Sequence, residues 1–181
     1  MTAIPNPEKI TAEEYYKLTE NTEERTELID GQIVAMASPS RMHQRISGRL
    51  FSRADQFISA NGGKCEAMQA VDVQLDDGNV VVPDLLVMCD PSKADDKRYY
   101  GAPDWVIEVT STNRSDDFDR KFRLYRNAGV REYWIVDTDE RRVIVYDFDQ
   151  HPNVVEFYDW TDEIPVRIYG GALKIRIEDL V

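Results

Sequence analysis

The amino-acid sequence predicts a mixed α/β fold. Two strongly apolar runs, DWVIEVTS at 104–111 and REYWIVD at 131–137, flank a segment with helical spacing at about 116–127. Strand-like runs precede and follow this unit, and a helix between two strands with strand-rich flanks is typical of a sheet covered by helices. With 181 residues, 42% of them hydrophobic, the chain is expected to form one domain over 1–181, with 1–10 as a loose lead-in.

The first third of the chain predicts a short helix, a hairpin and a long helix. Thr11 followed by Glu14 is a capping box, which begins a helix in TAEEYYKL. The Asp-Gly pair at 30 and 31, between the apolar runs of ELIDGQIVAM, is a strong hairpin signal. Apolar residues then recur at helical spacing between 40 and about 60, which predicts the longest helix.

The remaining segments predict strands. KCEAMQAVDVQL at 64–75 is interpreted as one long or bent strand, and VVVPDLLVMC at 80–89 as another. A polar loop then leads to the strand–helix–strand unit. From 141 onwards, short strands joined by turns are predicted in RRVIVYDF, NVVEFYDW, PVRIY and LKIRI.

The composition is acidic, with 22 Lys and Arg against 34 Asp and Glu and a formal net charge of −12. Such a charge repels polyanions on average, so a nucleic acid would have to meet a local basic patch or bound cations. The sequence shows neither a signal-peptide pattern nor an apolar run approaching about 18 residues. The expectation is therefore a cytoplasmic protein with no membrane partner.

The two cysteines, Cys65 and Cys89, lie in strand-like segments without CxxC spacing or a histidine companion. This pattern suggests neither a disulfide framework nor a zinc site. Both are expected to be small core residues.

Two carboxylates interrupt the apolar strands of the middle region. Asp84 follows Pro83 inside VVVPDLLVMC, and Glu108 is the charged residue of WVIEV. Burying an unpaired carboxylate costs on the order of several kcal/mol. Both become tolerable if they bind one hard cation such as Mg²⁺, which takes carboxylate oxygens and water as ligands. The alternatives are that Asp84 caps a turn at an edge strand and that Glu108 pairs with a surface arginine.

The helix predicted at about 116–127 has a lysine on its apolar side. At about 100° per residue, Phe118, Phe122 and Tyr125 form one apolar stripe, and Lys121 falls inside it. The neighbouring arginines fall on the opposite side, where charges on a packed helix normally lie. An inward lysine is expected where the sheet presents negative charge; the alternative is that its side chain extends out of the stripe into solvent.

Arginines recur every fourth residue along the long helix, at Arg41, Arg45, Arg49 and Arg53. This spacing predicts one basic stripe along which a phosphate backbone can lie. The alternative is a solvated face balanced by acidic neighbours. More positive charge is expected near the lysine-bearing helix, from Arg114, Arg120, Arg123 and Arg126.

Four segments carry a family resemblance, in the order ELIDGQIVAMASPSRMHQRI, VPDLLV, GAPDWVIEVTS and KFRLYRNAGVREYWIVD. From about Glu27 to Asp147 the chain closely resembles the Uma-two family of restriction-endonuclease-like proteins, a branch of the PD-(D/E)xK nuclease superfamily. The resemblance implies an α/β, restriction-endonuclease-like fold in which helices flank a mixed central sheet.

The resemblance also implies catalytic roles. Asp84 matches the Asp of the PD element and Glu108 the acidic residue of the second element, both as ligands of Mg²⁺ or Mn²⁺. The residue two positions after Glu108 is Thr110 rather than the superfamily's lysine. In the Uma-two branch the lysine comes from the following helix, which makes Lys121 the catalytic lysine.

Two further positions match the family. Glu27 matches an acidic position that can complete the metal shell or orient water, and its alternative role is that of a strand carboxylate beside the hairpin. His43 matches a position from which an imidazole can hydrogen-bond a substrate phosphate or a site carboxylate, and its alternative is a local structural contact.

These residues predict a metal-dependent endonuclease that hydrolyses phosphodiester bonds, with DNA as the expected substrate and a homodimer expected if both strands of a duplex are cut. The alternative is a catalytically inactive nuclease-fold module that binds nucleic acid or a protein partner. A receiver-like phosphoacceptor domain is disfavoured because no acidic pair ends an earlier parallel strand. A P-loop enzyme is disfavoured because the sequence has no GxxxxGK[ST] motif.

Overall fold

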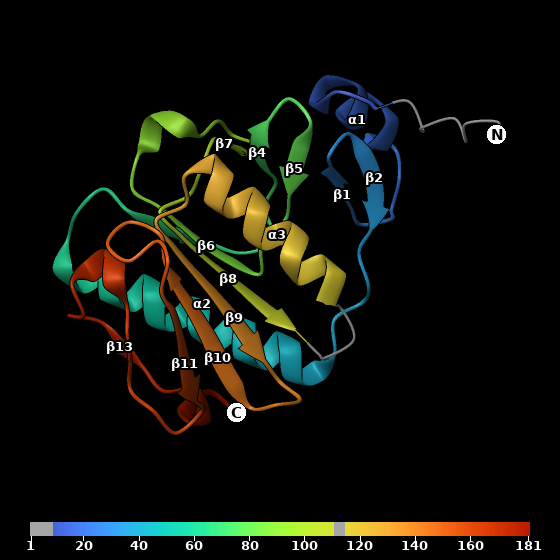
Figure 1. Ribbon diagram of the computed structural model, residues 1–181. Coiled ribbons are helices and arrows are strands. Elements are labelled where there is room, and N and C mark those ends of the chain that lie inside the picture. The colour runs from blue at the N-terminus through green and yellow to red at the C-terminus, as the bar shows by residue number, and fades with distance from the viewer. Residues whose placement is uncertain (1–8, 111–114) are drawn as a thin grey trace.

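The computed structural model describes residues 9–110 and 115–181, with the backbone alone at 115–118 (Figure 1). Most of the predicted lead-in lies outside these residues. The helices are α1 (Ala12–Thr19), α2 (Arg41–Asn61) and α3 (Ser115–Ala128), with short 3-10 helices η1 (Pro91–Lys93), η2 (Arg167–Tyr169) and η3 (Ile177–Leu180). Across the described chain, none of the helices has the length and apolar character needed to cross a membrane.

Within the described residues, the strands form three sheets. The largest has six strands in the order β11-β10-β9-β8-β6-β3, the second has five in the order β2-β1-β5-β4-β7, and β12 pairs with β13. The strands are β1 (Thr26–Ile29), β2 (Gln32–Ala35), β3 (Glu66–Met68), β4 (Val73–Asp76), β5 (Asn79–Val81), β6 (Leu85–Met88), β7 (Tyr99–Tyr100), β8 (Trp105–Thr110), β9 (Glu132–Asp137), β10 (Arg142–Asp147), β11 (Val155–Asp159), β12 (Ile164–Pro165) and β13 (Lys174–Ile175).

The six-stranded sheet is mixed, which confirms the predicted fold class. β8 and β9 run parallel with α3 as their crossover, whereas β6 pairs with β8 and β10 with β9 in antiparallel fashion. Parallel neighbours need such a crossover connection, and a helix is the usual one.

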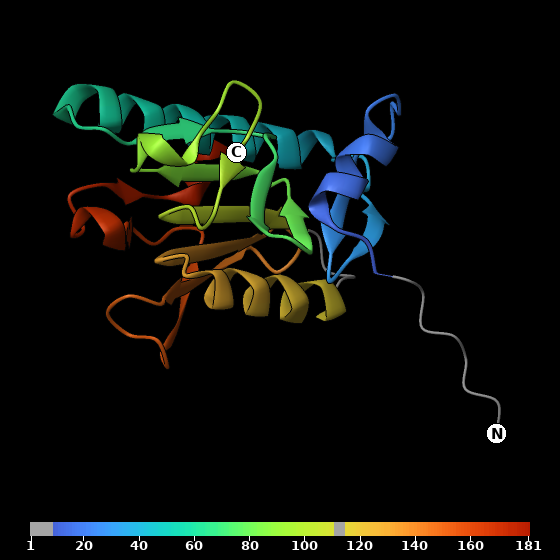
Figure 2. The same cartoon turned by 90° about the horizontal axis from the view of Figure 1, so that it is seen from above.

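Helices cover both faces of this sheet (Figure 2). Side chains alternate along a strand, so Trp105, Ile107 and Val109 of β8 pack on the α2 side. Val106 packs on the α3 side. Glu108 follows the same alternation, and its register partner Ile135 also belongs to the α3 side. The strand therefore directs this carboxylate toward α3.

The hairpin and the first capping box form as predicted. β1 and β2 are joined by Asp30 and Gly31, which both have positive φ angles, of 52° and 77°. This is the backbone that an Asp-Gly turn between antiparallel strands adopts. At α1, the Thr11 hydroxyl accepts from the Glu14 N–H, and the Glu14 carboxylate accepts from the Thr11 N–H.

The predictions of single strands at 64–75 and 80–89 were wrong, because both runs change sheets. β3 and β6 belong to the six-stranded sheet, whereas β4 and β5 belong to the five-stranded one. Between β3 and β4 the backbone turns at Ala70, whose φ is 52°. Between β5 and β6 stands Pro83, which has no N–H for a sheet ladder. Asp84 is therefore placed at the junction of two sheets, immediately before β6.

The cysteine prediction was also wrong, because Cys65 and Cys89 form a disulfide. They lie directly before β3 and directly after β6, whose antiparallel register pairs Glu66 with Met88. The next pair along this ladder is the two cysteines. Their 24-residue separation does not reveal this pairing, since it depends on the strand register.

Candidate active site

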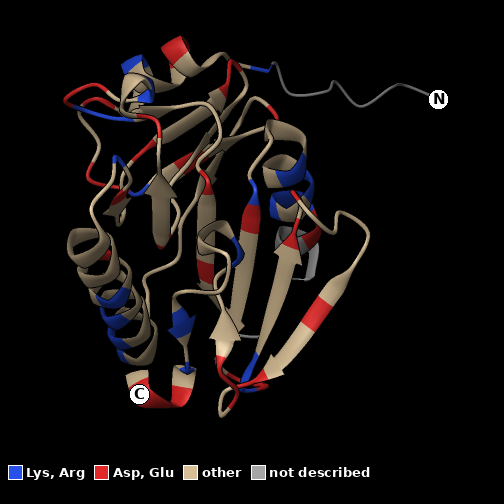
Figure 3. Cartoon of the chain, turned by 90° about the vertical axis from the view of Figure 1, so that its left-hand side faces the viewer, with Lys and Arg blue, Asp and Glu red and all other residues tan. Residues whose placement is uncertain are grey.

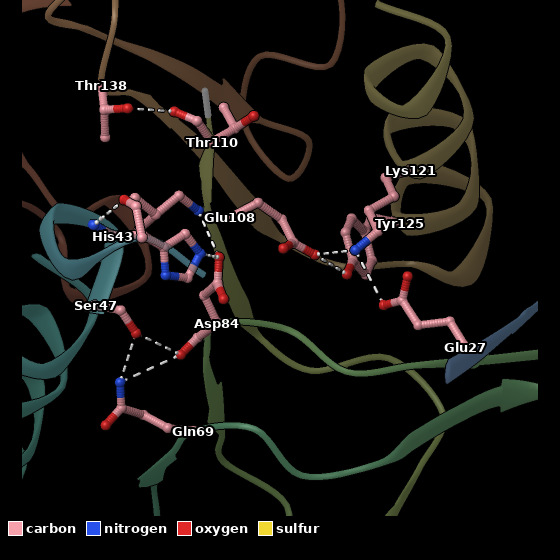
Figure 4. Close-up of polar contacts among 12 residues, drawn as sticks. Glu27, His43, Ser47, Gln69, Asp84, Glu108, Thr110, Lys121, Tyr125 and Thr138 are labelled. Atoms are coloured by element: carbon pink, nitrogen blue, oxygen red, sulfur yellow. Dashed lines mark hydrogen bonds and ion pairs between the residues drawn. The ribbon is translucent and has the colours of Figure 1, made fainter. Parts of the chain in front are cut away.

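A pocket of about 350 Å³ lies where the two larger sheets meet, and it contains all the principal residues predicted from the sequence. Its walls come from the β1–β2 hairpin, the first turns of α2, the β5–β6 junction, the end of β8 and α3 (Figure 4). Segments far apart in the chain thus contribute Glu27, His43, Asp84, Glu108 and Lys121 to one cavity.

Asp84 is held in a fixed orientation at the base of this pocket. Its Oδ2 accepts from the backbone N–H of Val109 at 2.8 Å and lies 2.9 Å from Nε2 of His43. Its carbonyl oxygen accepts from the hydroxyl of Ser47 at 3.2 Å. Within the described part of the chain, Oδ1 makes no hydrogen bond, so one carboxylate oxygen remains available to a ligand.

Lys121 lies between two carboxylates. Its Nζ is 3.0 Å from Oε1 of Glu108 and 3.0 Å from Oε1 of Glu27. Its side chain is only 10% exposed, which places it on the inward face of α3 and not in solvent. Glu108 also accepts from the hydroxyl of Tyr125 at 2.6 Å, and Glu27 from the N–H of Val82 at 2.9 Å. Glu108 thus pairs with the inward lysine instead of a surface arginine.

Burial governs the electrostatics of this cluster. It raises the pKa of Glu108 to about 7; the charge of Lys121 opposes this, and the charges of Asp84 and Glu27 add to it. Burial alone would lower the pKa of Lys121, but Glu108 and Glu27 raise it above its ordinary value. The pocket thus combines three carboxylates with Lys121, which contacts two of them, and with Arg25 at its margin. Asp84, which Lys121 does not contact, keeps a negative charge that favours a cation.

The donor set fits a hard divalent cation. Asp84 and Glu108 each have one carboxylate oxygen without a hydrogen bond inside the described residues, and two carboxylates completed by water suit Mg²⁺ or Mn²⁺. In the same part of the chain, no three His, Cys, Asp or Glu side chains are grouped to hold an ion by themselves. Glu27 is engaged by Lys121 and Val82 through Oε1, so its place in the metal shell stays a prediction.

His43 reaches the site because Ser40 begins α2. The Ser40 hydroxyl accepts from the His43 N–H at 3.1 Å, and this cap sets the first turn of the helix beside Asp84. His43 was expected to hydrogen-bond either a substrate phosphate or a site carboxylate. The structure shows the contact to a carboxylate, that of Asp84.

Three pocket-region side chains were not identified from the sequence. Tyr125 lies one turn after Lys121, and Ser47 one turn after His43, so helical spacing could have indicated both. Gln69 donates to the Ser47 hydroxyl at 2.7 Å. The sequence does not indicate a role for Gln69. It directly follows β3, and the end of β3 could not be recognised inside the single strand predicted at 64–75.

The predicted arginine stripe is exposed along α2 (Figure 3). It begins in the helical turn that also carries His43, and so starts beside the pocket. Arg49 donates to the carbonyl oxygen of Val181 at 3.0 Å. Among the arginines expected near α3, Arg114 lies outside the described residues.

The chain is similar to a known protein family and to two proteins of a cyanobacterium. The model of the Uma2 family, described as "Putative restriction endonuclease", matches residues 12–168. "Uncharacterized protein slr1290" of Synechocystis sp. (strain ATCC 27184 / PCC 6803 / Kazusa) is 33% identical over 179 residues, covering 93% of this chain and 90% of the relative. "Uncharacterized protein sll1609" of the same organism is 26% identical over 144 residues, covering 76% and 80%.

The fold also has a counterpart among solved structures. The crystal structure of "a putative nuclease belonging to DUF820" from Anabaena variabilis ATCC 29413 superposes with a TM-score of 0.78 at 26% sequence identity. The match covers 94% of this chain and 97% of that one. With a family match over most of its length and a fold shared with a nuclease-like protein, the chain belongs to the Uma2 family of restriction-endonuclease-like proteins.

Proposed function

We propose that the protein is a metal-dependent endonuclease that hydrolyses phosphodiester bonds in DNA. The observation that carries this proposal is the convergence of Asp84, Glu108 and Lys121 on one pocket, from the β5–β6 junction, β8 and α3. A homodimer with twofold symmetry would bring two such pockets to the two strands of a duplex.

Each site residue has a task in this proposal. Asp84 and Glu108 would hold a divalent cation, which when bound supplies polarisation of a phosphoryl oxygen and activation of water. Lys121 stays charged between its two carboxylates and stabilises the negative charge that develops on the phosphate, or positions the nucleophile. Tyr125 and His43 orient Glu108 and Asp84 through one oxygen each, which leaves the other oxygen for the cation.

The direct test is cleavage of labelled oligonucleotides. With Mg²⁺ or Mn²⁺ we expect single-stranded, duplex or branched DNA to be cut, and excess chelator to stop the reaction. RNA of matched sequence serves as the comparison substrate. If the protein binds the cation and the nucleic acid but cuts none of the substrates, the inactive binding module is the correct description.

Divalent cations should also stabilise the fold. At 100-fold excess over Kd, a cation that binds only the folded state adds about 2.7 kcal/mol, or roughly 5–10 °C in Tm. Because the pKa of Glu108 is raised to about 7, protons compete with the metal below that pH. The Mg²⁺-induced rise in Tm should therefore be larger at pH 8 than at pH 6. Equal melting curves with and without metal at pH 8, together with no heat of binding, would exclude the site.

The arginine stripe should contribute phosphate contacts. Replacing Arg45 and Arg49 together by alanine should weaken DNA binding to a similar extent for all sequences and flatten its salt dependence, by a slope change of about 0.9 per lost contact on duplex DNA. The control is a double variant of Lys97 and Lys174, two exposed cations outside α2 and α3, which removes the same charge. Equal effects of the two double variants would mean that only net charge matters.

A further inference from the structure

A second cavity, of about 190 Å³, adjoins the candidate active site. Arg25, Met36 and Ala70 line both cavities, so the two share a wall. The second cavity lies between α1, the hairpin and the segment after β3, and its lining also includes Asp72 and Val82. It is smaller than the roughly 300–1,000 Å³ of pockets for drug-sized ligands, which suits a single ring system.

Asp72 is the unusual member of this lining. Its side chain makes no hydrogen bond or ion pair within the described residues, although burial is sufficient to raise its pKa against the opposing charges of Arg98 and Arg25. A partly buried carboxylate without a donor is unfavourable, and a ligand that donates an N–H to it recovers that free energy. The structure thus leaves one strong acceptor open to the cavity.

The other polar groups of this cavity define what a ligand can meet. The hydroxyl protons are already donated inside the protein: Thr19 to the Tyr15 carbonyl, Thr22 to the Thr19 carbonyl, and Tyr15 to Thr26. The guanidinium of Arg25 makes no side-chain hydrogen bond or ion pair in the described part of the chain, and it stands at the boundary with the active-site pocket. The lining also includes Glu24, an exposed carboxylate. A ligand therefore finds a partly buried anionic acceptor, Asp72, in the cavity and a cation, Arg25, on the side shared with the active-site pocket.

This pattern matches one nucleotide of a strand. The amino groups of cytosine, adenine and guanine are donors that a carboxylate accepts, whereas thymine presents a single ring N–H. The apolar side chains of Met36, Ala70 and Val82 provide a surface for a flat ring. A phosphate would be repelled by Asp72 but attracted to Arg25. A nucleotide can meet both conditions if its base lies in the cavity beside Asp72 and its phosphate lies near Arg25, toward the active-site pocket.

We propose that this second cavity, lined by Asp72, is a base-recognition subsite. It takes one unpaired nucleobase that bears an exocyclic amino group, next to the phosphodiester bond that is cleaved. The subsite rests on the proposed nuclease function, since it is defined relative to the scissile phosphate. A base can enter only from a single strand or after leaving the duplex stack.

The test uses single-stranded oligonucleotides of oligothymidine with one variable base. We expect the parent to bind and cut strands containing one cytosine, adenine or guanine about tenfold better than all-thymine strands, as one charge-assisted hydrogen bond allows. Asp72→Asn should reduce this preference to within about twofold. The side chain makes no bond within the described fold, so the variant should keep the parental Tm. Asp96→Asn makes the same change at an exposed surface position and should keep the preference.

Cleavage and binding are read separately, so that the two proposals fail in different ways. Binding is followed by fluorescence anisotropy and by base-dependent shifts of the methyl signals of Met36, Ala70 and Val82. Base-selective binding without cleavage contradicts the nuclease but keeps the subsite. Cleavage with no base preference, or an unchanged preference in Asp72→Asn, overturns the subsite. Failure of the parent to bind any of the strands also overturns it.

Discussion

Replacing Lys121 by alanine is expected to lower the rate of metal-dependent cleavage by about 10² or more, the effect of losing one preorganised electrostatic stabiliser. The cation should still bind, since Asp84 and Glu108 remain. Single-turnover cleavage at saturating metal measures the first effect, and calorimetric titration with Mg²⁺ or Mn²⁺ measures the second. Cleavage at the parental rate would show that the lysine has no part in the reaction.

The surroundings of Lys121 make a stability control necessary. The substitution leaves Glu27 and Glu108 buried without their shared cation, and breaking such a buried ion pair costs about 3–5 kcal/mol. The double variant Glu27→Gln with Lys121→Ala removes one charge of each sign, and it should recover part of the lost Tm. Cleavage should stay low in both variants. If cleavage recovers along with Tm, the single variant was inactive only because it was partly unfolded.

The sequence predicts which side chains meet in this pocket better than it predicts the sheets that bring them together. Lys121 could be placed inward because a helix has a fixed period, and the helix is visible in the spacing of its apolar residues. Asp84 and Glu108 could be singled out because a charge inside an apolar run is costly wherever that run lies. Each of these inferences uses only the pattern of neighbouring residues, and none requires knowing which distant segments come together.

The features that could not be predicted are those that depend on which strands pair with each other. VVVPDLLVMC has the same apolar pattern whether it lies in one sheet or crosses between two, so the position of Asp84 at a junction was not visible. The same holds for the bond between Cys65 and Cys89, which follows from the register of β3 with β6. The contacts of Glu27 to Lys121 and Val82 likewise depend on distant segments, because β1 pairs with β5 and Lys121 belongs to α3.

Replacing Asp84 is expected to abolish metal binding and cleavage together. In Asp84→Asn the side-chain oxygen can still accept from the Val109 N–H, whereas the charge that holds the cation is lost. Asp84→Ala should give the same loss with the hydrogen bond removed as well. Because a bound cation contributes several kcal/mol to stabilising the transition state, cleavage should fall by about 10³ or more.

The Tm of the Asp84→Asn variant, measured with and without Mg²⁺, separates the role of Asp84 from that of Lys121. The charge of Asp84 raises the pKa of Glu108, so removing it relieves repulsion between two carboxylates. Without metal the variant should therefore melt close to the parent, and adding Mg²⁺ at pH 8 should leave its Tm unchanged. Lys121→Ala should show the reverse, with a lower Tm in the absence of metal and a preserved rise on adding it. A parental rise in Tm with Mg²⁺ in Asp84→Asn would mean that the cation is held elsewhere, and the assignment of Asp84 as a ligand would have to be abandoned.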